Sequence, residues 1–130
     1  MTTRTLVFLA AGLEAATGVL LVANPGFVVH LLIGASLSGG GAAVGRVCGL
    51  GLLSLGMSAW PSGKIVSAQA TWCLFTYNLL SALYIGYLGA RGGFAGYLLW
   101  PACFLHGLTA LLLTGHVYGT VRRKWLENYQ

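Results

Sequence analysis

Hydrophobic residues fill four long stretches of this chain, and short segments rich in glycine, proline and charged residues separate them. Each stretch is about 20 residues long, the length that an α-helix needs to cross the hydrocarbon core of a bilayer. The pattern therefore predicts an all-α fold, a polytopic membrane four-helix bundle that forms a single transmembrane domain over residues 1–130. The predicted spans cover residues 5–23, 41–60, 65–89 and 97–121, each within a few residues.

A fifth apolar stretch, residues 27–37, is too short to span. Runs of this length more often lie at the membrane interface or re-enter it. Asn24-Pro25-Gly26 precedes this stretch and should end the first span, because proline cannot continue the helical hydrogen-bond ladder. We expect a short interfacial helix between the first two spans, with His30 near the lipid headgroups.

The composition agrees with a membrane protein. Hydrophobic residues make up 57% of the chain and charged residues 7%, whereas soluble domains carry about 25% charged residues. Because so few charged residues cannot cover a surface that faces water, we expect lipid to surround most of the protein. Because Glu14 interrupts the first apolar stretch and no small-residue cleavage site follows, that stretch is expected to be a retained helix rather than a signal peptide.

The basic residues that give the chain its net charge of +5 lie mostly where orientation signals of membrane proteins are found. Basic residues at the ends of spans mark the cytoplasmic side. Five of them fall on one side when both termini are cytoplasmic: Arg4, Lys64, Arg122, Arg123 and Lys124. The layout predicts a multi-pass membrane protein with both termini in the cytoplasm. A nucleic-acid partner is not expected, because that function needs a basic stripe on a folded face.

Each span carries one polar group that is costly in lipid: Glu14, Arg46, Asn78 and His106. A lone charge at the centre of a membrane helix costs about 2.5–3.5 kcal/mol, and a paired carboxylate and guanidinium offset much of that cost. We therefore expect a buried salt bridge between Glu14 and Arg46, with Asn78 or His106 nearby. The alternative is that Arg46 extends outward to the interface and leaves the carboxylate alone.

This polar cluster admits three functions. A carboxylate held by an arginine is poorly suited to carrying protons, so a structural role leads, in a non-enzymatic accessory or stabilising subunit of a larger membrane complex or a homo-oligomer. The first alternative is a proton-coupled small-molecule or ion transporter that uses Glu14 and His106. The second is a subunit that binds haem or a chlorophyll-type pigment through His106, with His30 as the available partner on another segment.

Enzymatic activity is not expected. The chain contains no HExxH motif, no GxSxG motif and no phosphate-binding loop. Its second acid, Glu127, lies in the C-terminal tail and gives Glu14 no acid–base partner in the membrane. No CxxC or Cys/His cluster is present, so no metal site is expected.

Several short motifs are similar to those of a family of uncharacterised small bacterial four-helix integral membrane proteins. They are Leu13-Glu14 with Gly18, Leu31-Leu32-Ile33-Gly34, Arg46 with Gly49, Leu55-Gly56, Trp60-Pro61, Tyr77-Asn78, Leu83-Tyr84, Leu98-Leu99-Trp100-Pro101-Ala102 and Leu105-His106. The resemblance spans nearly the whole chain, and it implies the architecture without an activity.

The first span also resembles that of the small multidrug-resistance antiporters, which have a glutamate followed closely by glycine, as Glu14 and Gly18 are here. In that family the carboxylate exchanges protons for cations, so the resemblance implies a transport role for Glu14. Arg46 is a departure from the family, and so is the lack of its tryptophan and glycine pattern in the third span.

Overall fold

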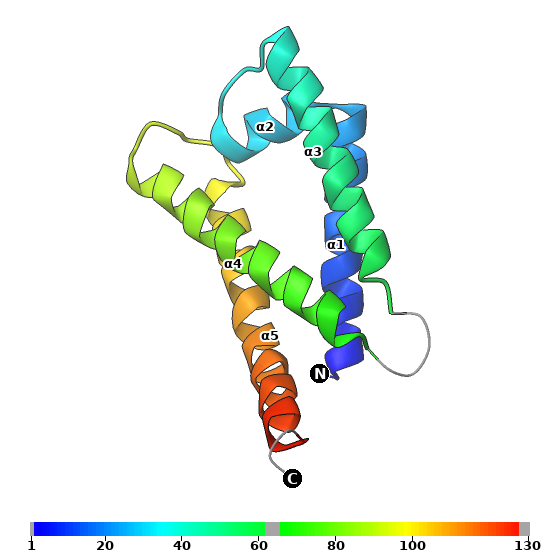
Figure 1. The fold of residues 1–130 in the computed structure, drawn as a ribbon. Helices are drawn as coiled ribbons and strands as arrows, with labels where there is room; N and C mark the ends of the chain where they lie inside the picture. The colour runs from blue at the N-terminus through cyan, green and yellow to red at the C-terminus, as the bar shows by residue number, and fades with distance from the viewer. Residues whose placement is uncertain (1, 62–65, 128–130) are drawn as a thin grey trace.

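The computed structural model describes residues 2–61 and 66–127, and within these ranges all regular secondary structure is α-helical. Figure 1 shows its helices, which are α1 (Thr3–Ala23), α2 (Pro25–Ile33), α3 (Gly39–Ser58), α4 (Ala68–Ala90) and α5 (Leu99–Glu127). Helices α1, α3 and α4 and the Leu99–Gly119 part of α5 are long and apolar enough to cross a membrane. The all-α fold with four long apolar helices and a short helix between the first two is confirmed.

The break between α1 and α2 lies at Asn24, as the sequence predicts. The Asn24 amide donates to the carbonyl of Leu20 and so closes α1, while its side-chain Oδ1 accepts from the amide of Phe27 at 3.1 Å and caps α2. Pro25 then fills the first turn of α2, where a missing N–H costs nothing. Helix α2 is shorter than the predicted 27–37, because Gly34 ends it in the left-handed conformation with φ 73°.

Serine side chains begin the next two long helices. Ser38 accepts from the amide of Gly41, so α3 starts slightly earlier than the predicted residue 41. Ser67 accepts from the amide of Ala70 and starts α4. The predicted start of the third span at residue 65, and Lys64 beside it, lie outside the described residues.

The four long helices form two pairs rather than one evenly packed bundle. Helix α1 packs along α3 and α4 packs along α5, while contacts between the two pairs are sparse. Figure 1 shows the pairs meeting near the N-terminus of α1 and diverging toward the end that carries α2. A buried apolar cluster joins them where they meet: Leu6, Val7, Ala10, Ala11, Ala59, Leu74 and Leu113.

Glycines bring α1 and α3 into close contact. A Cβ atom on Gly18 would lie 2.5 Å from the amide nitrogen of Leu53, and one on Gly49 would lie 2.8 Å from the carbonyl oxygen of Gly18. Both distances are too short for a side chain, so the two backbones pack directly, as small residues allow in membrane helices.

Helix α2 joins the two pairs at their open end. The amide of Ala95 donates to the carbonyl of Ile33 at 3.3 Å, and the amide of Leu98 donates to the carbonyl of Leu31 at 2.9 Å. These bonds attach α2, which follows α1, to the segment that leads into α5. The diverging pairs are therefore bridged at one end by α2 and at the other by the apolar cluster (Figure 1).

Candidate functional site

Three of the four predicted polar groups meet in a network between the pairs. Asn78 on α4 donates through Nδ2 to Glu14 Oε1 on α1 at 3.2 Å and to the carbonyl of Leu74 at 2.9 Å. His106 on α5 places Nδ1 2.8 Å from Asn78 Oδ1 and 3.9 Å from Glu14 Oε1. Glu14 and Asn78 are each 1% exposed, whereas the His106 side chain is 14% exposed, so the network is buried except at His106.

The bonding partners fix the direction of each hydrogen bond. The Leu74 carbonyl can only accept, so the amide nitrogen of Asn78 must face it and Oδ1 must face His106. Because Oδ1 is also an acceptor, Nδ1 of His106 carries a proton and donates it to that bond. The other ring nitrogen, Nε2, is the atom of His106 that is left to exchange a proton or to bind another group.

The predicted ion pair between Glu14 and Arg46 is wrong. Arg46 is exposed, and its Nε donates to the backbone carbonyl of Val22 at 3.3 Å. Val22 lies in the last turn of α1, where carbonyls lack partners within the helix and carry the negative end of its dipole. A cation is stabilised there, and Arg46 reaches this position without extending inward to the carboxylate.

A buried ion-pair contact does exist, but it involves a different residue. The His106 imidazole lies where the Arg46 guanidinium was expected, 3.9 Å from Glu14 Oε1. The expectation that Asn78 and His106 lie near Glu14 is confirmed. The carboxylate is therefore held by an amide and an imidazole, and no permanent positive charge neutralises it.

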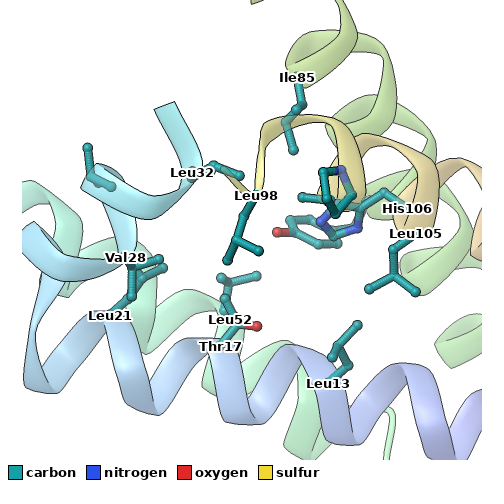
Figure 2. A pocket seen from close by; sticks show the side chains of 14 residues that line it. Leu13, Thr17, Leu21, Val28, Leu32, Leu52, Ile85, Leu98, Leu105 and His106 are labelled. Carbon is teal, nitrogen blue, oxygen red and sulfur yellow. The ribbon is translucent and has the colours of Figure 1, made fainter. Parts of the chain in front are cut away.

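A cavity of about 360 Å³ lies between the two pairs, beside this network. Figure 2 shows His106 among the side chains that line it. The lining comprises Leu13, Thr17, Leu21, Val28, Val29, Leu32, Leu52, Tyr77, Ile85, Leu98, Pro101, Ala102, Leu105 and His106, which come from all five helices and the segment before α5. His106 thus contributes both to the network and to the cavity wall.

The cavity has one polar and one apolar end. The rings of Tyr77 and His106 are in edge-to-face contact, with their centroids 5.7 Å apart, near the network. The apolar side chains of α2 line the other end of the cavity (Figure 2). From Leu13 to Leu21, the lining of α1 extends over about 12 Å, at a rise of about 1.5 Å per residue. The cavity is therefore an elongated slot whose hydrogen-bonding groups lie mainly near the middle of the long helices.

The two candidate haem or pigment ligands are not brought together. His30 is exposed on α2, and the cavity that His106 lines does not include it. Within residues 2–61 and 66–127, no group of three or more His, Cys, Asp and Glu side chains is close enough to hold a metal ion.

Sequence reasoning did not identify Thr17 and Tyr77 as lining residues. Thr17 lies one turn after Glu14 on α1, and Tyr77 directly precedes Asn78 on α4. The spacing of Thr17 was a usable signal, because a residue three positions away on a helix shares its face. Tyr77 offered no such signal, because adjacent residues on a helix point in different directions. What the sequence does not contain is the divergence of the helix pairs, which creates the space.

No protein-family model, no curated protein and no solved structure matches the chain. The resemblances to small four-helix membrane families therefore stay predictions. The function is argued from the network and the cavity.

Proposed function

We propose that this protein is a proton-coupled carrier of a small molecule in a bacterial inner membrane, with both termini in the cytoplasm. Glu14 and His106 form the proton-binding pair, and the adjoining cavity is the cargo site. One observation carries the proposal: the His106 ring contacts the buried Glu14–Asn78 pair and is also part of the cavity wall.

Charge balance supports this role. Since Arg46 does not neutralise Glu14, the network is electrically neutral only when Glu14 and His106 together hold one exchangeable proton. Gaining or losing a proton leaves a net charge inside the membrane, which costs about 2.5–3.5 kcal/mol. The network therefore favours a defined proton count, and a change in that count must be offset by another event.

Cargo binding supplies that event. A molecule in the cavity lies against His106 and interacts differently with the neutral and the charged imidazole. Such a difference in affinity links proton binding to cargo binding, and the linkage acts equally in both directions. Reciprocal coupling of this kind is the thermodynamic requirement for a proton-driven carrier.

The accessory-subunit function depended on a Glu14–Arg46 pair, and for this reason it takes second place. It stays a prediction with its own test. An accessory subunit should co-purify in a fixed ratio with a larger complex in mild detergent, whereas a carrier should purify alone or as a homo-oligomer. Native mass spectrometry of the protein taken from its own membrane distinguishes these two outcomes.

Proton flux in liposomes tests the carrier function. The full-length protein is reconstituted with a pH-sensitive dye inside, a membrane potential is imposed, and proton entry is recorded before and after addition of 1-octanol. Octanol is the probe because the cavity lining is mostly apolar and carries a few hydrogen-bonding groups. We expect octanol to change the proton flux, and we expect Glu14→Gln to abolish that change because it removes the proton site with little change of shape. Arg46→Gln is the matched control and should retain it. Equal flux in wild type and Glu14→Gln would contradict the proposal.

A further inference from the structure

We infer that the cargo of this cavity is an uncharged alcohol or phenol with a mainly hydrocarbon body, whose hydroxyl group binds at the His106 end while the hydrocarbon lies toward α2. This inference deepens the proposed carrier function, because it names the chemical class that the same site takes.

The lining argues against a charged molecule. Apart from Thr17, Tyr77 and His106, every lining side chain is apolar, and among these lining residues there is no Lys, Arg, Asp or Glu. An ion entering the cavity would lose its hydration without gaining an opposite charge there, which is strongly unfavourable. An uncharged molecule with a large apolar surface matches the lining.

The hydrogen-bonding pattern at the polar end selects a hydroxyl group. Nδ1 of His106 is occupied by Asn78 Oδ1, so Nε2 faces a ligand as an acceptor when the ring is neutral and as a donor when it is charged. A hydroxyl group can donate to the first form and accept from the second. The hydroxyls of Tyr77 and Thr17 supply further donors and acceptors in the same lining. A hydroxyl therefore stays paired whichever proton state the network adopts.

The size and position of the cavity restrict the body of the molecule. A volume of about 360 Å³ is at the lower end for small-molecule sites, which span about 300–1,000 Å³. The slot extends about 12 Å along α1, from the polar end to the side chains of α2. Because the two helix pairs make few contacts with each other, a lipid-soluble molecule reaches the slot between them.

Photolabelling tests the class of ligand. The probe is an octanol with a diazirine in its chain, compared with the matching alkane, which lacks the hydroxyl, and the matching carboxylate. The full-length protein in lipid nanodiscs is irradiated with each, and labelled residues are identified by mass spectrometry. We expect the alcohol to label Leu52 and Ile85, lining residues that are half-buried and buried respectively, and unlabelled octanol to compete. Labelling of these two residues by the alkane should be roughly threefold to tenfold weaker, the loss expected for one neutral hydrogen bond.

Two sets of variants test whether the probe is bound in the slot and whether the polar end recognises its hydroxyl group. Leu98→Trp adds a bulky ring to the lining of the slot and should abolish labelling of Leu52. Leu111→Trp, on the 69% exposed outer face of α5, adds the same ring without touching the slot and should leave the labelling unchanged. Tyr77→Phe removes a hydroxyl from the polar end, so it should reduce the preference for alcohol over alkane while alkane labelling persists. A purely structural role of Tyr77 would not change that ratio.

Equal labelling of Leu52 and Ile85 by alcohol and alkane would overturn the inference, and so would stronger labelling by the carboxylate or labelling confined to exposed residues of the outer helix faces. The photolabelling result and the proton-flux result test the ligand class and the carrier function separately. Specific labelling of the slot without octanol-dependent proton flux would contradict the carrier but support the ligand class. Flux that depends on Glu14, without labelling of the slot, would contradict the ligand class alone.

Discussion

At the scale of single residues, Asn78 is the link on which the network depends. Its amide is the one group of the three that can donate to a carboxylate and accept from an imidazole at the same time. In the interior of a membrane no water can take over either bond. Replacing Asn78 by leucine would leave Glu14 Oε1 and His106 Nδ1 without these bonds.

Double-mutant cycles measure this link. We expect Asn78→Leu alone to lower the free energy of unfolding by about 1–3 kcal/mol, the cost of leaving a buried polar group unsatisfied. Combined with Glu14→Leu, which removes the acceptor, it should show a coupling energy of about 0.5–3 kcal/mol, because the two side chains share a hydrogen bond. Reversible unfolding in mixed detergent micelles provides the measurement.

The matched control cycle combines Glu14→Leu with Arg46→Gln. These two effects should be additive within about 0.5 kcal/mol, since Arg46 bonds to the carbonyl of Val22 instead. A larger coupling energy in this cycle than in the Asn78 cycle would mean that the arginine and the carboxylate interact after all.

The sequence indicates which polar residues need a partner in the membrane. It is a poorer guide to which residue that partner is. Glu14, Asn78 and His106 were expected to meet because each is costly alone in lipid, and they do meet. Arg46 was misplaced because its long side chain can reach either a carboxylate or an unpaired carbonyl at a helix end. That choice depends on the rotation of α3 against α1, which composition and spacing do not determine.

At the scale of secondary-structure elements, α2 connects the halves of the molecule through its C-terminal end. Gly34 has φ 73°, and a Cβ atom there would lie 3.2 Å from the carbonyl carbon of Ala95. Gly92 has the same φ of 73° but has no atom within 4 Å of such a Cβ. The two glycines therefore share a backbone requirement and differ in their surroundings.

Substitution of both glycines by alanine separates the two effects. Gly92→Ala should lower the free energy of unfolding by about 1–2 kcal/mol, the cost of a left-handed alanine. Gly34→Ala should cost more, because it also pushes the end of α2 away from residues 95–98, and it should speed hydrogen exchange of the Ala95 and Leu98 amides. Equal costs and unchanged exchange would show that α2 is not held by this contact.

The end of α1 follows from local chemistry, and so it could be predicted, whereas the end of α2 at Gly34 was missed by a prediction that ran to residue 37. Asn24-Pro25 ends one helix and begins the next within a few residues. The bonds from Ala95 and Leu98 back to α2 could not be predicted, because they join backbone groups that are distant in the sequence and carry no side-chain signature.

At the scale of the whole molecule, the two helix pairs hold the network and the cavity in one place. The apolar cluster joins the pairs at one end, α2 bridges them at the other, and the cavity lies between. Four apolar helices were predictable from the length of the hydrophobic stretches. Their divergence was not, because lipid-facing and protein-facing apolar side chains look alike in a sequence.

Solid-state NMR of the protein in lipid bilayers tests the central arrangement most directly. With histidine, asparagine, glutamate and arginine side chains labelled with ¹³C and ¹⁵N, and the His106 signals assigned by their loss in His106→Gln, contacts through space can be recorded from the imidazole and from the carboxylate. The predicted result is that Nδ1–H of His106 correlates with the side-chain carbonyl of Asn78, and the Glu14 carboxylate with the Asn78 amide. A Glu14 carboxylate that correlates with the Arg46 guanidinium instead would contradict it.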